Sequence, residues 1–142
     1  MDRRGLVKTA LAALVGAAAS RAEADPERPQ RVAYHLSDAD KTVFVLGNIR
    51  NHVAGANGPL RLALVVHGGA LATFRANTRD QAIRDGFDGA LKAGVGLYAC
   101  AHTLEAQKLA LKDLLPGFSV AEKGAVVLLA DLQAQGWAYL RP

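Results

Sequence analysis

Three residues in this sequence are able to carry out chemistry together: Cys100, His67 and His102. Cys100 is the only cysteine, so it cannot form a disulfide within the chain. It ends a β-rich run directly before a predicted helix, whose N-terminus would favour the nucleophilic thiolate. His102 follows two residues later, and His67 ends another apolar run, so either histidine could help to remove the thiol proton. We therefore take these three residues as the candidate catalytic set.

Each candidate also has a purely structural interpretation. A free cysteine is among the residues most often buried, so Cys100 could equally pack as a small apolar side chain. His67 could tie down the following loop by bonding backbone carbonyls. The adjacent pair Gly68 and Gly69 is a weak signal, because it could serve only to allow a tight turn. The residues alone leave a reactive and a structural cysteine equally open.

No cofactor or metal is expected. The dinucleotide fingerprint Gly-x-Gly-x-x-Gly and the phosphate-binding Gly-Lys-Ser/Thr loop are both absent. Asp38 and Asp40 follow the first predicted strand and would repel a flavin phosphate. The cysteine and histidines lack the close spacing of structural zinc ligands. Copper held by Cys100 with His67 is a weaker alternative, in which the thiol would serve as a redox or metal sensor.

The composition argues against nucleic-acid binding. The chain has 142 residues, which fits one domain, and a net charge of +4. Four of the basic and two of the acidic residues lie within residues 1–24, so the rest carries a charge of only +2. It contains no basic run and no alternation of basic and aromatic residues that would stack bases. We expect no nucleic-acid partner.

The N-terminal segment has the pattern of an export signal. Arg3 and Arg4 precede an apolar stretch from Thr9 to Ala19, and the small-x-small pattern Ala22-Glu23-Ala24 follows. Paired arginines are typical of twin-arginine signals, which export folded proteins. The stretch is shorter than the roughly 20 residues of a membrane span. We predict a signal segment over residues 1–24 and a periplasmic protein that is free of the membrane after signal removal. An uncleaved anchor and an ordinary amphipathic helix are the alternatives.

Short β-rich runs alternate with helical patterns after a polar leader over residues 25–30. Such alternation predicts parallel strands with helices on both faces of the sheet. We therefore expect an α/β domain over residues 31–142, a flavodoxin-like three-layer sandwich with a five-stranded, mainly parallel sheet. The predicted strands are 31–36, 60–67, 95–100, 118–121 and 137–140.

Helices are expected between these strands. In the last of them, four apolar residues in a row, 126–129, indicate cover on more than one side, by another subunit or by deep burial. The predicted helix starts are a cap at Ser37, a capping box of Thr78 with Gln81, a cap at Thr103 for a helix reaching Leu115, and the start of a last helix over 124–135.

Ligands of such sheets bind at the carboxyl ends of the strands. The residues at those ends are Ser37, His67 with its two glycines, and the run from Cys100 to Thr103.

Three stretches of the chain resemble the DsrE/DsrF-like family of small sulfur-relay proteins, especially its exported, single-cysteine branch. They run from Leu64 to Gly68, from Gly94 to Leu104 and from Asp131 to Pro142. The resemblance implies a flavodoxin-like fold that assembles into trimers or hexamers. It also implies that Cys100 matches a cysteine that carries sulfur as a persulfide, and that His67 matches a recurrent histidine near that site.

Two functions follow from the residues and the resemblance. The first is a sulfur carrier or sulfurtransferase in periplasmic sulfur metabolism, in which Cys100 accepts and passes on sulfane sulfur with help from His67 or His102. The alternative is a non-catalytic, oligomeric module that binds a small ligand or partner and has a structural cysteine. The sequence identifies neither the sulfur donor nor the acceptor.

Overall fold

The centre of the structure is built from the two most apolar runs of the sequence. The computed structural model describes residues 28–142, so the predicted signal segment and residues 25–27 of the leader lie outside the described residues. Strand β1 (Gln30–Leu36) pairs in parallel with β2 (Leu60–Val66) along its whole length, from Gln30 opposite Leu60 to Leu36 opposite Val66. Both strands are buried at their carboxyl halves, as expected for strands covered on both faces.

Three shorter strands complete the sheet. β3 (Gly96–Cys100) pairs with β2, and β4 (Ser119–Ala121) pairs with β3. β5 (Ala138–Leu140) returns to the other side of β1. The order is β4-β3-β2-β1-β5, and every pairing is parallel. The predicted flavodoxin-like α/β class and its five strands are therefore confirmed.

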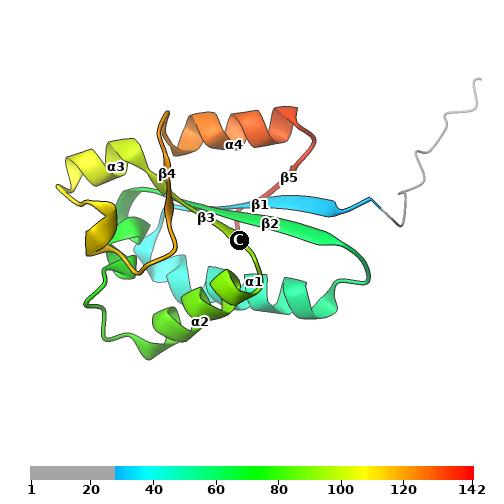
Figure 1. Ribbon diagram of the computed structural model, residues 1–142, viewed down its shortest axis with the longest axis horizontal. Coiled ribbons are helices and arrows are strands. Elements are labelled where there is room, and N and C mark those ends of the chain that lie inside the picture. Colours follow the sequence, from blue (N-terminus) through cyan, green and yellow to red (C-terminus); the bar gives the residue numbers. More distant parts are fainter. Residues whose placement is uncertain (1–27) are drawn as a thin grey trace, which may run out of the picture.

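Helices cover the two faces unequally. Figure 1 shows α1 (Thr42–Gly55) and α2 (Gln81–Lys92) together on one face, and α4 (Ala125–Ala134) on the opposite face. The short α3 (Ala101–Ala106) follows β3 at the carboxyl edge of the sheet. Three 3-10 turns connect these elements: η1 (Ala39–Lys41), η2 (Gly68–Phe74) and η3 (Leu111–Asp113).

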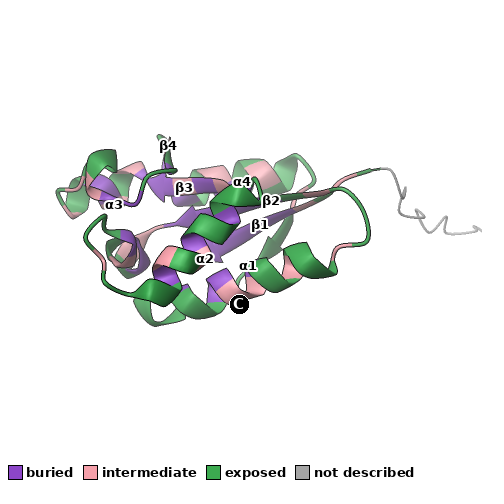
Figure 2. Ribbon diagram, turned by 60° about the horizontal axis from the view of Figure 1, so that its bottom comes forward, coloured by how far each residue is buried: buried purple, intermediate pink, exposed green. Residues whose placement is uncertain are grey.

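The two faces also differ in what they bury. Under α1 and α2, the rings of Phe74, Phe87 and Phe118 lie 5.0–5.6 Å apart in a large apolar cluster. Under α4 the buried cluster is small and contains Cys100. Figure 2 shows the buried residues along the strands and the inward sides of the helices. Within residues 28–142, no helix is both long enough and apolar enough to cross a membrane.

The predicted cap at Ser37 is wrong. The chain first makes the 3-10 turn η1, and α1 begins only at Thr42. The carbonyl of Ser37 instead accepts a hydrogen bond from the N–H of Ala70 (3.0 Å), and its hydroxyl accepts one from Arg141 (2.9 Å). Ser37 therefore joins three loops at the carboxyl edge of the sheet rather than starting a helix.

The predicted capping box at Thr78 and Gln81 is also wrong. Asp80 is the N-cap of α2, and its carboxylate accepts hydrogen bonds from the N–H groups of Ala82 and Ile83 at 3.0 and 3.2 Å. A carboxylate at a helix N-terminus is favoured by both hydrogen bonding and the helix dipole.

The predicted long third helix is the largest error. α3 begins at Ala101, with Cys100 as its N-cap, and ends at Ala106. Lys108 then takes a left-handed conformation (φ 53°), which stops the helix. The chain turns back because Leu114 forms a β-bridge with Arg75, and the N–H of Leu115 bonds the carbonyl of Phe74. Tertiary packing has overridden the helical spacing of the leucines.

Candidate functional site

A groove of about 450 Å³ opens at the carboxyl edge of the sheet. The chain leaves β2 toward α2 on one face but leaves β4 toward α4 on the other face, which Figure 1 makes visible. The groove is lined by residues that follow β2, β3 and β4, and the carboxyl ends of the strands are where ligands of such sheets bind. Cys100, His67 and His102 all line the groove, so the structure brings the three predicted site residues together.

Two helix N-termini converge on the sulfur atom of Cys100. Cys100 is the N-cap of α3, and its Sγ accepts a hydrogen bond of 3.3 Å from the N–H of Ala125, the first residue of α4. Burial raises the pKa of this thiol, but hydrogen bonds from the backbone of Thr103, the backbone of Ala125, the Thr103 hydroxyl and the backbone of His102 outweigh burial and lower that pKa below its ordinary value. The site therefore favours a negative charge on sulfur.

Side chains of α3 and of Gln107, the residue that follows it, hold the loop after β2 in place. The hydroxyl of Thr103 accepts a hydrogen bond from the N–H of Gly68 (3.0 Å), and the Gln107 amide donates to the Gly68 carbonyl (2.9 Å). Gly68 has a φ of 59°, in the left-handed region. Thr103 therefore tethers the His67 loop and also bonds the cysteine sulfur, instead of capping α3 as the sequence predicted.

Gly124 fits the site because it has no side chain. A Cβ at this position, where φ is 94°, would lie 2.6 Å from Cδ2 of His102 and 3.9 Å from the Cys100 sulfur. The His102 ring therefore lies directly against the start of α4, where a side chain at position 124 would displace it.

A hydrogen-bonded chain that the sequence analysis missed leads away from His67. Nε2 of His67 lies 2.6 Å from Nε2 of His35, and Nδ1 of His35 lies 2.6 Å from the hydroxyl of Tyr139. His35 is only 8% exposed. Burial, the neighbouring His67 and the positive Arg141 lower the pKa of His35 to about 4, against the opposing effect of Asp38. Burial and Arg141 also lower the pKa of His67. Both rings are therefore neutral at neutral pH.

A sequence signal for His35 did exist. Side chains alternate between the faces of a strand, so His35 shares the face of Ala33, two residues earlier, and this face packs under α4. His35 lies within the strand, whereas Ser37, the predicted residue at this strand end, follows it. Tyr139 was harder to find, because its place opposite Ala33 depends on the pairing of β5 with β1.

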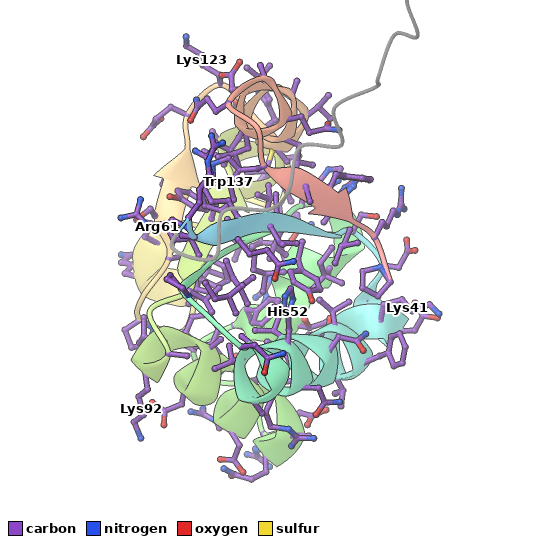
Figure 3. All side chains as sticks on the ribbon, turned by 90° about the vertical axis from the view of Figure 1, so that its right-hand side faces the viewer. Lys41, His52, Arg61, Lys92, Lys123 and Trp137 are labelled. Atoms are coloured by element: carbon purple, nitrogen blue, oxygen red, sulfur yellow. The ribbon has the colours of Figure 1, made fainter. Side chains whose placement is uncertain are left out.

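The groove contains few charges. Among the described residues that line it, Lys123 is the one with a permanent charge, and Figure 3 shows this lysine projecting outward on the α4 side. Val126 lies at the rim and is 69% exposed, so deep burial within the monomer is wrong as an explanation for the apolar run 126–129. Within residues 28–142, no three His, Cys, Asp or Glu side chains converge so as to hold a metal ion.

The chain matches no protein-family model and no curated protein. Its fold does occur in solved structures. It is similar to protein MTH1491 of unknown function from Methanobacterium thermoautotrophicum, with a TM-score of 0.71 and 27% identity over 80% of this chain and 99% of that one.

Two further solved structures share the fold at lower identity. The ychN protein from E. coli gives a TM-score of 0.62 at 17% identity, over 80% of this chain and 99% of that one. The conserved protein BT1422 of unknown function from Bacteroides thetaiotaomicron gives 0.55 at 18% identity, over 79% of this chain and 95% of that one. These likenesses establish the fold.

Proposed function

We propose that this protein is a sulfur carrier related to the DsrE/DsrF-like proteins, in which Cys100 accepts sulfane sulfur and passes it on. One observation carries the proposal. The only sulfur atom of a cysteine in the chain lies beside a groove and receives hydrogen bonds from the starts of two helices. A buried cysteine with a merely structural role needs neither the groove nor the anion-stabilising N–H groups.

The chemistry is an exchange between sulfur–sulfur bonds. The Cys100 thiolate attacks the terminal sulfur of a polysulfide, so that a new S–S bond forms while the S–S bond of the donor breaks. The shortened polysulfide leaves with the electron pair and takes up a proton. No net oxidation or reduction occurs. Delivery to an acceptor thiolate is the reverse reaction.

The surroundings of Cys100 suit each stage of this exchange. The N–H of Ala125 and the hydroxyl of Thr103 stabilise the thiolate, and after transfer they remain close to the anionic persulfide. Lys123, at the groove, would attract an anionic sulfur compound rather than repel it. His67 and His102 stand on the groove wall as candidates for handling the proton.

Sulfur uptake gives the direct test. Purified full-length protein is exposed to polysulfide, and its mass is measured by mass spectrometry without a reducing agent. We expect the mass of one or more sulfur atoms to be added to the wild type and none to Cys100→Ser. Wild-type protein alkylated beforehand with iodoacetamide is the second control, since its thiol is blocked while every other residue is the same. Absence of added sulfur on the wild type would refute the proposal.

The alternative of a structural cysteine makes a different prediction for reactivity. Cys100 is 4% exposed, but it borders the groove. A carrier must let a small reagent reach the sulfur in the native state. Alkylation of the native protein within minutes by iodoacetamide supports the carrier, whereas reaction only after denaturation supports the binding module.

We further propose that the protein works in the periplasm, because residues 1–24 carry the twin-arginine pattern. N-terminal sequencing of protein from the periplasmic fraction should then begin near Asp25. An intact Met1 in the cytoplasmic fraction would overturn this assignment.

We also propose a homo-oligomer, a trimer or a hexamer. The exposure of Val126 and Val127 beside the groove, at 69% and 41%, supports a partner on this side of α4. Light scattering of the wild type should give a multiple of the monomer mass, and Val126→Glu should reduce it. A monomeric wild type would contradict this.

A further inference from the structure

We propose that Tyr139, His35 and His67 form a proton relay that connects the Cys100 groove with solvent at the β5 edge of the sheet. This inference rests on the proposed sulfur transfer, and it adds two residues, His35 and Tyr139, to the working site. Both are positioning residues, because they act on the groove only through His67.

The geometry of the two histidines is that of a linear hydrogen bond. Their ring centres lie 4.8 Å apart and the rings are inclined by 22°, while the two Nε2 atoms are 2.6 Å apart. The distance between the ring centres exceeds the distance between the two Nε2 atoms by about one ring diameter, that is, by one ring radius on each side. The line through the two nitrogens therefore passes nearly through both ring centres. The rings therefore meet edge to edge, and one shared proton lies between the nitrogens.

The two ends of the hydrogen-bonded series Tyr139–His35–His67 reach different environments. His67 lines the groove, and within residues 28–142 no group bonds its Nδ1, which leaves this nitrogen to serve the groove. Tyr139, at the other end, is 38% exposed on the edge strand β5. Only His35, in the middle, is buried. A proton that enters at one end can therefore leave at the other.

Burial and the charged groups around Tyr139, His35 and His67 keep the two histidines neutral. Arg141 lies on the tail after β5, where it donates a hydrogen bond to Ser37 and approaches the Asp38 carboxylate at 3.8 Å. Burial is the main reason why the pKa of each ring lies below its ordinary value; the arginine lowers both further, His67 lowers that of His35, and Asp38 opposes these effects only in part. A neutral chain of this kind has two proton arrangements of similar character.

In the first arrangement, Tyr139 donates to Nδ1 of His35, Nε2 of His35 donates to Nε2 of His67, and the one ring N–H proton of the neutral His67 is on Nδ1. In the second, every donor along the chain is reversed, and Nδ1 of His67 carries no proton. Conversion from the second to the first takes a proton from the groove at Nδ1 of His67 and releases one to solvent at the tyrosine hydroxyl. The opposite conversion returns a proton to the groove.

Sulfur transfer needs both conversions. When Cys100 begins as a thiol, its proton must leave before the sulfur can attack, and the departing sulfur species later needs a proton. Above the pKa of the thiol, the thiolate is already formed and the first of these steps disappears. The relay should therefore matter most at low pH.

The test measures the rate of sulfur uptake from polysulfide by full-length protein at about pH 6 and at about pH 9. Tyr139→Phe removes one hydroxyl at a partly exposed position, and His35→Gln keeps a polar side chain that cannot shuttle protons. We expect both variants to be slower than wild type by roughly tenfold near the lower pH and to match it near the higher pH.

The chain offers a matched control. Tyr34 and His52 form a second Tyr–His hydrogen bond of 2.8 Å on the other face of the sheet, where Figure 3 shows His52 between the sheet and α1. Tyr34→Phe removes the same atom from a pair that does not reach the groove, so its rate should equal that of the wild type at both pH values. Equal rates for Tyr139→Phe and wild type at the lower pH would overturn the relay. So would an equal loss at both pH values, which indicates a structural role.

Nuclear magnetic resonance separates the failure of the relay from the failure of the proposed function. A coupling between the two Nε2 nuclei, transmitted through the hydrogen bond, is expected in ¹⁵N-histidine-labelled wild type and not in His35→Gln. Absence of this coupling in the wild type overturns the relay even when sulfur is transferred. If the coupling is present but no sulfur is taken up, the proposed function fails and the relay loses its role with it.

Discussion

The two faces of the sheet differ in the kinds of side chain that they bury. The face under α1 and α2 is filled by apolar side chains, including three phenylalanine rings in mutual contact, and it also contains the polar pair Tyr34–His52. The face under α4 has one helix of ten residues and a small buried cluster around Cys100. At the carboxyl edge of this second face lie the histidine chain and the groove.

Because of this difference, most of the stabilising apolar burial lies on one face of the sheet and the candidate site lies on the other. Apolar burial stabilises the fold in proportion to the area removed from water, and it does so mainly under α1 and α2. A face that buries a neutral histidine and a thiol with a lowered pKa contributes less, because each polar group must be matched by a hydrogen bond. Substitutions on the two faces should therefore change different measurements.

The largest expected effect is on the α1/α2 face. Phe74→Ala removes a ring that is fully buried between Phe87 and Phe118, so it should lower the free energy of unfolding by about 3–5 kcal/mol in urea denaturation. Cys100→Ala should cost only about 1 kcal/mol and yet abolish sulfur uptake. Comparable losses of stability from the two substitutions would mean that the faces do not differ in this way.

Acid should weaken the α4 face through His35. Its folded-state pKa of about 4 lies below the ordinary value of 6.5, so the unfolded chain binds a proton before the folded protein does. The stabilisation is complete above about pH 6.5 and is lost as the pH falls toward 4. The loss should be about 2–3 kcal/mol in urea titrations of the wild type. His35→Gln should flatten this slope; an unchanged slope would assign the acid sensitivity to other groups.

Two glycines allow the comparison to be made with the same substitution. Gly124→Ala places a Cβ against His102 and forces alanine to a φ of 94°, which should cost about 2 kcal/mol and alter the alkylation rate of Cys100. Gly47→Ala in α1, with no atom within 4 Å of the new Cβ, should stabilise the protein by about 0.5–1 kcal/mol and leave that rate unchanged. We expect the free energy of unfolding, measured in urea, to fall for Gly124→Ala and to rise for Gly47→Ala. A lower free energy of unfolding for both variants would contradict this expectation.

The sequence predicted the sheet well because strand signals are local. The apolar runs of β1 and β2, and the left-handed glycines Gly94 and Gly136 that follow two helices, depend on neighbours in the chain. The candidate residues Cys100, His67 and His102 were found for a related reason, since carboxyl ends of parallel strands share one edge.

Features that depend on distant segments were missed. The third helix stops early because Leu114 and Leu115 bond the segment around Phe74, about forty residues earlier in the chain. The partners His35 and Tyr139 are 104 residues apart and meet only because β5 pairs with β1. No local pattern encodes that pairing, so the histidine chain could not be derived from spacing.

The start of α2 gives the smallest and most local of the predictions. The sequence predicts a capping box of Thr78 with Gln81, whereas the carboxylate of Asp80 accepts the two N–H bonds. Asp80→Ala should therefore lower the free energy of unfolding by about 1 kcal/mol, and Thr78→Ala, which loses only a long 3.3 Å contact with the N–H of Asp80, should have little effect.

Both changes lie at the start of α2, and neither residue lines the groove, so sulfur uptake should be the same in both variants as in the wild type. Urea denaturation and mass spectrometry on the same samples measure the two properties side by side. If Thr78→Ala proves the more destabilising, the threonine is the effective cap. If Asp80→Ala slows sulfur uptake, then the stability of α2 is coupled to the groove through the sheet. The stabilising face and the face with the site are then not independent.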